Sequence, residues 1–523
     1  MMAIILKSSY LHPSIITFSF LNKLEFKDYQ LWPRSFGKRA YYIGSKCIFL
    51  GRNNNVINSS CYLDKVVVME FDVRSKGLDG YFGTRRSSNM MKNYCIVGLG
   101  SRGLYMFAKD LVDYYKDVAR VTGLCDINPG RIKNAQRVLG VEIPGFEDFD
   151  EMLDSVDCDI VIVTTKDATH DQFIIRAMER GKDVITEKPM TMNEQKCRAI
   201  LDAEKRTGRN VRVTFNYRYA PYKTEIKRLL KEGIVGDIHS VEFRWFLDTV
   251  HGADYFRRWH AQKVNSGGLA VHKATHHFDL INWWLDKEPV EVAAMGSRHF
   301  YVPDHLQNHG DRCSTCSVSK DCEFYLDLNA DDKLRTLYKE NEQYDGYFRD
   351  QCVFSEDINI EDTISAVVRY PEGIQLTYGL TAATSFEGWQ VAFNGSKGRL
   401  EAFEPEWFVD RENQTEFANR QSSSVRKPQD WRISENGKGK AFDSLQIRFY
   451  PLFGGVSTFA VPYVQEGHGG GDRRLKDHLF KDASHDPLGH IAGSRAGAMS
   501  ILVGIAANHS IAQRKFIRIE DLL

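Results

Sequence analysis

The most suggestive polar residues of this chain lie close together near its middle. His272, His276 and Asp279 are spaced four and three residues apart. If segment 271–285 forms a helix, two imidazoles and a carboxylate share one face, with His277 turned away from it. Such a face could bind a metal ion or transfer protons. The spacing leaves both alternatives open, with a structural role as a third.

A second candidate is Lys188, in the sequence Glu187-Lys188-Pro189. These residues follow segment 183–186, which has the composition of a buried strand. Because a lysine is costly in a hydrophobic core, one at the end of such a strand is a candidate for contact with a substrate or cofactor. A solvated lysine at a strand end is the alternative of equal weight.

Three glycines have a spacing that suits a bound dinucleotide. Gly98, Gly100 and Gly103 read G-x-G-x-x-G, between an apolar run at 94–97 and an amphipathic pattern over 104–115. In a strand–turn–helix of this kind the first glycine permits the turn. The second lets the backbone approach a pyrophosphate, and the third lets the helix pack on the strand. Free N–H groups at the start of the helix then bind the phosphates.

A carboxylate stands where such a site binds the ribose hydroxyls. Asp126 ends the next strand-like run, 118–125, at the expected distance of about twenty residues after the glycines. Asp126 would repel a 2′-phosphate, and the first arginine after it is Arg131. The sequence therefore favours NAD over NADP.

The composition excludes several classes of protein. The chain has 523 residues, 42% of them hydrophobic, which suits two or three domains with sizeable cores. Lys plus Arg and Asp plus Glu both number 69, so no basic excess points to nucleic acid or a membrane surface as partner. No apolar run has the length of a membrane span. The ten cysteines lack the pattern of a secreted disulfide framework, which predicts a reducing, cytoplasmic location.

Strands and helices alternate over residues 90–215. The strands are expected at 94–97, 118–125, 159–165, 183–186 and 211–215. This alternation predicts an α/β domain with a doubly wound parallel sheet of Rossmann type, which binds ligands at the carboxyl ends of its strands.

The pattern becomes rich in strands after Pro221. Strands are expected at 240–245, 292–297, 365–370 and 375–380, with helices near 271–285 and 496–512. Residues 216–523 are therefore predicted to form an α+β domain with a large open, mostly antiparallel sheet and a polar insertion at about 300–354. Residues 1–89 are predicted to be a poorly ordered N-terminal extension, arising from a start codon assigned too early or serving as a targeting arm.

From about residue 92 to the C-terminus the chain resembles the Gfo/Idh/MocA oxidoreductase family, named for glucose-fructose oxidoreductase and inositol dehydrogenase. The segments that carry the resemblance occur in the order of that family. They are the glycine loop 98–103, Thr165 with His170, Glu187-Lys188-Pro189, Asn216-Tyr217-Arg218-Tyr219 with Pro221, Gly267-Gly268 leading to His276-x-x-Asp279, Glu361-Asp362-Thr363, and Gly395-Ser396-Lys397-Gly398.

The resemblance implies a mechanism. NAD would lie across the first domain, and a sugar, cyclitol or glycoside would lie between it and the second sheet. Lys188 would polarise the reacting hydroxyl, His276 would take its proton, and Asp279 would hold the substrate. The implied cofactor-binding residues are Gly98, Gly100, Ser101, Arg102, Gly103, Asp126, Thr165, His170, Glu187, Asn216 and Arg218. Relatives often associate through the open sheet, so a homodimer or homotetramer is expected.

One departure from the family keeps a second reaction open. His272 stands where members commonly carry an aspartate, and Ala274 replaces a usual glycine; His272 stays among the catalytic candidates. Some relatives are glycoside hydrolases that hold NAD and oxidise the sugar only transiently, so that elimination cleaves the bond without net NADH. A third alternative is an NAD-binding sensor in which Lys188 and His276 do no chemistry. The spacing does not name the substrate or the hydroxyl.

Two further segments carry reactive residues. Cys313, Cys316, Cys322 and Cys352 could hold a structural zinc ion, with an iron–sulfur cluster or free thiols as alternatives. The glycine-rich segment 467–472 either delivers His468 or Asp472 to a substrate or is a flexible hinge.

Overall fold

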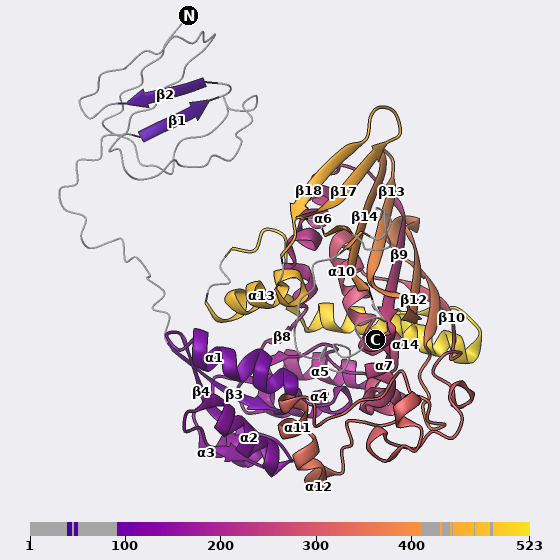
Figure 1. Ribbon diagram of the computed structural model, residues 1–523. Helices are drawn as coiled ribbons and strands as arrows, with labels where there is room; N and C mark the ends of the chain where they lie inside the picture. Colours follow the sequence, from indigo (N-terminus) through magenta and orange to yellow (C-terminus); the bar gives the residue numbers. More distant parts are fainter. Residues whose placement is uncertain are drawn as a thin grey trace, which may run out of the picture. The chain divides into compact units, whose positions relative to one another are not determined.

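The computed structural model describes residues 39–43, 46–50, 91–408, 429–430, 440–441, 443–464, 466–481 and 485–523. The chain divides into two units, Met1–Ser88 and Asn89–Leu523. In the first unit, β1 (Arg39–Ile43) and β2 (Lys46–Leu50) form an antiparallel pair. The rest of the predicted N-terminal extension lies outside the described residues. The second unit contains both predicted domains (Figure 1).

The first domain of this unit is built on a seven-stranded sheet with the spatial order β19-β8-β7-β6-β3-β4-β5. Its strands are β3 (Lys92–Val97), β4 (Ala119–Cys125), β5 (Gly145–Phe146), β6 (Ile160–Val163), β7 (Asp183–Thr186), β8 (Val211–Val213) and β19 (Ala492–Gly493). All neighbours pair in parallel except β19, which runs antiparallel to β8. Every residue of β6 is buried, as a strand covered on both faces requires. The predicted doubly wound sheet is confirmed.

Helices connect these strands. They are a π-helical segment (Arg102–Ala108) that continues into α1 (Lys109–Tyr114), then α2 (Pro129–Leu139), α3 (Phe149–Ser155), α4 (His170–Glu179) and α5 (Glu194–Thr207). Asn128, Asp148 and Asn193 cap three of these helices by accepting a backbone N–H bond. The α-helix predicted over 104–115 begins instead as a π-helix. There the Lys109 N–H bonds to the Leu104 carbonyl, five residues back.

The second domain is built on a nine-stranded sheet with the order β18-β17-β14-β13-β9-β12-β11-β10-β20. Its strands are β9 (Ile238–Asp248), β10 (Glu291–Ser297), β11 (Thr363–Arg369), β12 (Gln375–Thr384), β13 (Phe386–Gly395), β14 (Gly398–Phe408), β17 (Ser444–Pro451), β18 (Ser457–Pro462) and β20 (Ile517–Arg518). Neighbours are antiparallel except β9 and β12. A separate pair joins β15 (Gln429–Asp430) and β16 (Lys440–Ala441). The mostly antiparallel second sheet is thereby confirmed.

Nine α-helices of the described residues belong to this domain. They are α6 (Pro221–Lys231), α7 (Thr249–Arg257), α8 (Lys263–Ser266), α9 (Leu269–His272), α10 (Thr275–Leu285), α11 (Asp332–Leu337), α12 (Glu342–Asp345), α13 (Gly471–Phe480) and α14 (Ser494–Gln513). Among the described residues, no helix has both the length and the apolar composition to cross a lipid bilayer.

The single helix predicted over 271–285 is wrong, because the chain breaks between α9 and α10. The N–H groups of Lys273 and Ala274 both bond to the Leu269 carbonyl, at 3.2 and 2.9 Å. The hydrogen-bond ladder therefore slips by one residue at this point. His272 and His276 consequently do not share a face of one regular helix.

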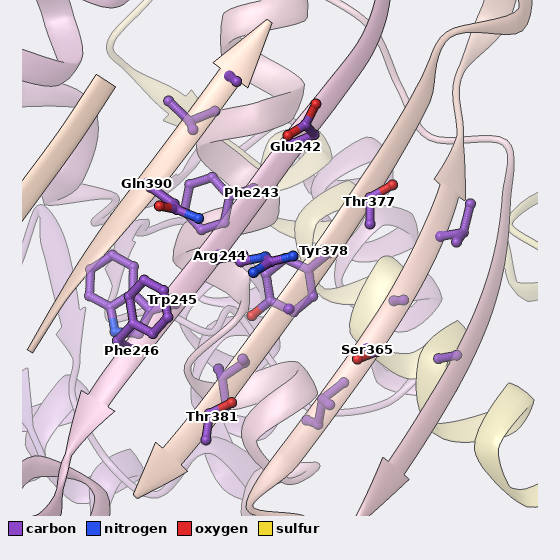
Figure 2. A pocket seen from close by; sticks show the side chains of 18 of the residues that line it. Glu242, Phe243, Arg244, Trp245, Phe246, Ser365, Thr377, Tyr378, Thr381 and Gln390 are labelled. Atoms are coloured by element: carbon purple, nitrogen blue, oxygen red, sulfur yellow. The ribbon is translucent and has the colours of Figure 1, made fainter. Parts of the chain in front are cut away.

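The outer face of the nine-stranded sheet is open and hollowed over about 1520 Å³. On neighbouring strands Thr377 pairs with Glu242, and Thr381 pairs with Phe246 (Figure 2). No residue of the glycine loop 98–103 lines this hollow. The residues with the chemistry expected of an active site instead line a second, smaller hollow in the described part of the chain.

Candidate active site

The glycine loop after β3 has the backbone geometry of a dinucleotide cradle. Gly98 has a φ of 92°, and a Cβ there would lie 2.7 Å from the backbone of Thr164. A Cβ on Gly103 would lie 2.0 Å from the Gly98 carbonyl oxygen, so the helix packs directly on the turn. At Gly100 the nearest atom to such a Cβ is the Tyr338 hydroxyl, at 3.8 Å. The loop therefore fits a turn, a close helix contact and an open approach for a pyrophosphate.

Asp126 is held at the end of β4. Its carboxylate accepts the N–H groups of Leu99 at 2.7 Å and Asn128 at 2.9 Å. Burial raises its pKa, and the neighbouring Arg131 at 3.3 Å opposes that shift. The structure thus brings Arg131 beside Asp126, although five positions separate them. Arg131 also pairs with Asp345 at 2.5 Å, so two carboxylates already engage it.

A cleft of about 660 Å³ opens beside this loop, within the usual range for small-molecule sites. The predicted cofactor residues that line it are Gly98, Gly100, Ser101, Arg102, Asp126, Thr165, His170, Glu187 and Asn216. Arg102 and Glu187 form an ion pair at 2.6 Å. Both ring nitrogens of His170 face carbonyl oxygens, those of Pro189 at 2.9 Å and Thr165 at 3.0 Å. His170 therefore links the ends of β6 and β7 through hydrogen bonds.

Lys188 extends from the end of β7 into the same cleft. Its Nζ lies 3.4 Å from the His272 carbonyl oxygen. Burial lowers the pKa of Lys188 to about 8, and the carboxylates of Glu187 and Asp167 oppose this shift. A lysine with this pKa exchanges its proton near neutral pH, which suits a group that contacts a reacting hydroxyl.

The two predicted catalytic histidines also line the cleft, from the segment around the helix break. His276 stacks on Tyr217, with ring centres 4.1 Å apart and planes 12° apart. Its buried Nδ1 has no hydrogen-bond partner among the described residues. Burial, together with the charges of Lys188 and Lys273, holds the pKa of His276 well below its usual value. His276 is therefore neutral and can accept a proton or a hydrogen bond.

Asp279 and Arg218 do not reach the cleft. The Arg218 guanidinium donates to both carboxylate oxygens of Asp279, at 2.7 and 2.5 Å, and both side chains are buried. Neither residue lines the cleft. The pair joins α10 to the segment Asn216–Tyr219 that follows β8. His277 donates to or accepts from the Tyr378 hydroxyl at 2.8 Å in the core, as expected for a structural histidine.

Two family models match this arrangement along the chain. The one described as "Oxidoreductase family, NAD-binding Rossmann fold" matches residues 92–215. The one described as "Oxidoreductase family, C-terminal alpha/beta domain" matches residues 227–519. The chain belongs to the Gfo/Idh/MocA oxidoreductase family. The predicted NAD-binding Rossmann domain and oxidoreductase class are thereby confirmed.

Several relatives in this family align over long stretches. YteT of Bacillus subtilis (strain 168) is 37% identical over 452 residues, covering 83% of this chain and 99% of YteT. The scyllo-inositol 2-dehydrogenase (NAD(+)) of the same strain is 30% identical over 203 residues, covering 38% of this chain and 56% of that enzyme. The solved myo-inositol 2-dehydrogenase from Lactobacillus plantarum superposes with a TM-score of 0.53. At 16% identity over 82% of this chain and 99% of that one, it shares the fold.

This family member carries further groups in the cleft, to which the sequence assigned no role. Asp167, after β6, lies with Oδ2 2.5 Å from Nδ1 of His272. Lys273 lies over the Trp245 ring at 4.4 Å. His260 packs edge-on against His272 with ring centres 4.2 Å apart. Because ligands bind at the strand ends of a Rossmann sheet, the position of Asp167 after a predicted strand indicated that it could lie in the site.

The rim of the cleft on the second domain adds two further histidines. His251 Nδ1 lies 3.0 Å from Glu387, whose pKa burial raises to about 7 against the opposing charge of Lys273. His468 lies 2.9 Å from Asp472 and has a φ of 51°. The glycine-rich segment 467–472 thus brings His468, and not Asp472, to the lining.

The insertion forms a wall of the cofactor side of the cleft. Its residues Leu326, Leu334 and Leu337 share one hydrophobic cluster with Leu104 and Leu111 of the Rossmann domain. We call segment 326–347 the strap. Three polar contacts tie it to the nucleotide-binding loops: Ser101 N–H donates to the Tyr338 hydroxyl at 3.2 Å, Asn128 Nδ2 donates to the Asn341 carbonyl at 3.0 Å, and Arg131 pairs with Asp345 at 2.5 Å.

Replacing Asp345 by alanine is expected to reduce the preference of the protein for NAD over NADP. Arg131 would lose one of its two carboxylates, so it could turn toward a 2′-phosphate. We expect the ratio of the NADP to the NAD dissociation constants to fall about tenfold, or about 1.4 kcal/mol. Fluorescence titrations with both dinucleotides measure it. The matched control is Asp332→Ala, since Asp332 lies in the same strap and its side chain is 89% exposed. An unchanged ratio in Asp345→Ala would contradict the role of this ion pair.

The predicted zinc site is not supported. Cys313, Cys316, Cys322 and Cys352 are free and partly exposed. Among the described residues, no group of three or more His, Cys, Asp or Glu side chains is arranged to hold a metal ion. Burial raises the pKa of Cys352 to about 11 and also raises that of Cys322.

Proposed function

We propose that this protein is an NAD-dependent oxidoreductase that transfers a hydride between a hydroxyl-bearing carbon of a sugar, cyclitol or glycoside and the nicotinamide. The observation that carries the proposal is that Lys188 and His276 line the same cleft as the glycine cradle. Relatives named as inositol dehydrogenases support the substrate class. The cleft volume, about 660 Å³, suits a dinucleotide end and a single small polyol.

Lys188 and His276 have complementary roles in this proposal. The Lys188 ammonium donates a hydrogen bond to the reacting hydroxyl and favours its loss of a proton. The neutral imidazole of His276 takes that proton. When bound, the nicotinamide supplies the two-electron chemistry, by taking the hydrogen from the carbon together with its electron pair. Gly98, Gly100 and the helix that follows them would hold the pyrophosphate.

NAD is the proposed cofactor in preference to NADP. Asp126 lies where the adenosine ribose hydroxyls are bound in such domains, and a 2′-phosphate would meet its carboxylate. The adjacent Arg131 is engaged by Asp126 at 3.3 Å and by Asp345 at 2.5 Å. Two carboxylates around one guanidinium give this part of the cleft a net negative charge. That charge favours the free 2′-hydroxyl of NAD over the 2′-phosphate of NADP.

The decisive experiment is turnover with a panel of sugars, polyols and glycosides. The purified chain, begun at Met90 and supplied with NAD, should accumulate NADH in proportion to the oxidised product. The absorbance of the reduced nicotinamide reports it directly. If no member of the panel yields NADH or any product, the proposed function is wrong.

The pH dependence of turnover should report the charge on Lys188. Its pKa is lowered to about 8, so the charged, hydrogen-bond-donating form is present below that value and is lost as the pH rises through it. We expect kcat/KM to fall above about pH 8. In Lys188→Arg the side chain stays charged at all accessible pH values, so the fall should disappear even if the rate is lower. A fall that persists in Lys188→Arg would assign it to another group.

A second reaction is supported by one observation. The cleft holds another histidine, His272, with its own carboxylate partner Asp167, whereas dehydrogenation moves only one proton from the substrate hydroxyl. A glycoside hydrolase that oxidises its sugar transiently needs further proton transfers for elimination. Release of an aglycone without accumulated NADH would establish this alternative.

Two other properties are proposed alongside the activity. The open face of the nine-stranded sheet, hollowed over about 1520 Å³, is the expected contact between copies in a homodimer or homotetramer. Light scattering on the eluting protein measures the mass, and a monomer at micromolar concentration would contradict this. A cytoplasmic location is supported by the eight cysteines from Cys95 to Cys352, all of which are free.

A further inference from the structure

A buried aspartate and a buried histidine from the two domains meet inside the cleft. Asp167 follows β6 of the Rossmann sheet, and His272 ends α9 of the second domain. The Asp167 Oδ2 and His272 Nδ1 atoms are 2.5 Å apart, and the side chains are 4% and 11% exposed. Both residues line the cleft. This contact joins positions that lie 105 residues apart in the chain.

The backbone that carries Asp167 is firmly held. Lys196 donates to the Ala168 carbonyl at 2.5 Å and pairs with Asp171 at 2.7 Å. The His170 ring is fixed between two carbonyl oxygens, and the Thr169 hydroxyl donates to the Lys166 carbonyl at 2.8 Å. Asp167 therefore presents its carboxylate to His272 from a rigid loop. Positioning groups of proton-transfer residues are built this way.

The second ring nitrogen of His272 remains available to a ligand. Nε2 has no hydrogen-bond partner among the described residues, and it is not one of the fully buried unsatisfied atoms. Because a carboxylate can only accept, an ionised Asp167 fixes the ring proton on Nδ1 and leaves the lone pair on Nε2 toward the cleft. The same division of roles orients the histidine of a catalytic triad.

We propose that Asp167 is a positioning residue that makes His272 a second proton-transfer group of the active site, alongside His276. A proton other than the one that His276 takes, from a carbon or a second hydroxyl of the substrate, goes to Nε2 of His272, which becomes an imidazolium beside the Asp167 carboxylate. The proton returns from Nε2 in the reverse direction. This inference rests on the proposed function, because it needs a substrate with a proton to give.

The couple and the lone His276 differ in the net charge that a bound proton leaves in the cleft. Proton uptake turns an Asp167–His272 pair of net charge −1 into a neutral pair, which burial favours. The same uptake turns the lone, buried His276 into a cation close to Lys188 and Lys273. The titratable and charged groups that face the couple are Lys188, Arg258, Glu187, Lys273, His260 and Tyr255. Burial raises the pKa of Asp167 and lowers that of His272, so the two titrate as one unit.

The test compares Asp167→Asn, His272→Asn and the double variant. Each single change should lower kcat about 100-fold while KM and the NAD dissociation constant stay within about twofold. The double variant should lose no more than either single variant, because the two residues act as a unit. The change of kcat/KM with pH that comes from titration of the couple should vanish in all three variants. Asp167→Glu should restore part of the rate.

The matched control is Asp486→Asn. Asp486 makes the same kind of contact with a histidine, His490, at 2.9 Å, and neither residue lines the cleft. This variant should melt at a lower temperature yet keep the pH profile of the wild type. A loss of rate in Asp167→Asn without a change of profile, or additive losses in the double variant, would overturn the proposal.

A second readout does not depend on turnover. ¹⁵N spectra of histidine-labelled protein, with the His272 signals identified by their absence in His272→Asn, report which ring nitrogen carries the proton. The wild type should show His272 protonated at Nδ1, and Asp167→Asn should change that state. If no substrate is ever turned over, the proposed function fails while these spectra still test the couple. Unchanged His272 signals in Asp167→Asn would overturn it.

Discussion

Replacing Lys188 by alanine is expected to lower turnover about a thousandfold while leaving NAD binding within about threefold of the wild type. Lys188 is the cation that the end of β7 delivers to the cleft, and its loss removes a donor that is strongest on the developing alkoxide. The neighbouring Glu187 and Arg102, which are proposed cofactor residues, stay paired at 2.6 Å, so we expect NAD binding to be retained. The effect should appear in kcat, with a small change in KM.

The control for Lys188→Ala is Lys182→Ala, at the opposite end of the same strand. Lys182 precedes β7 (Asp183–Thr186) and does not line the cleft. Turnover of this variant should match the wild type. Stopped-flow measurement with the best substrate of the panel, and a fluorescence titration with NAD, separate chemistry from binding. Turnover by Lys188→Ala within tenfold of the wild type would remove Lys188 from the chemical step.

The fold was predictable wherever the pattern is local. Buried parallel strands are continuous apolar runs, and β6 is one from Ile160 to Val163. The exposed-buried alternation along β11 and β12 likewise marks a sheet with one open face. The break between α9 and α10 was not predictable in this way. It arises where the N–H groups of Lys273 and Ala274 bond to the same carbonyl. This hydrogen-bond pattern does not change the spacing of apolar residues in the sequence.

The candidate site was predictable for residues at strand ends and in the glycine loop, because topology fixes where strand ends meet. Asp279 shows the limit of the argument from helical spacing. Its carboxylate accepts hydrogen bonds from Arg218, 61 residues away. The spacing of nearby residues does not predict which distant residue pairs with a buried charge. Asp345 shows the converse, since it reaches the cleft through a contact between distant segments. Asp167 follows the end of β6, and only its contact with His272 joins distant segments.

A pair of glycine variants separates the packing of the loop from its contact with the cofactor. In Gly103→Ala the new Cβ would lie 2.0 Å from the Gly98 carbonyl oxygen and 2.6 Å from the Thr164 hydroxyl. Backbone atoms cannot rotate away, so the start of the helix must shift. We expect a loss of stability of about 3 kcal/mol and no measurable binding of NAD. Thermal melting and the fluorescence titration measure both.

Gly100→Ala supplies the contrast. The nearest atom to its Cβ is the Tyr338 hydroxyl at 3.8 Å, an ordinary contact, so the melting temperature should stay within about one degree of the wild type. The pyrophosphate must nevertheless approach the backbone at this position, and we expect NAD affinity to fall at least about tenfold. Normal affinity in Gly100→Ala would show that the dinucleotide does not approach the loop there. Normal melting of Gly103→Ala would refute the packing argument, and together the two variants test whether one loop performs both tasks.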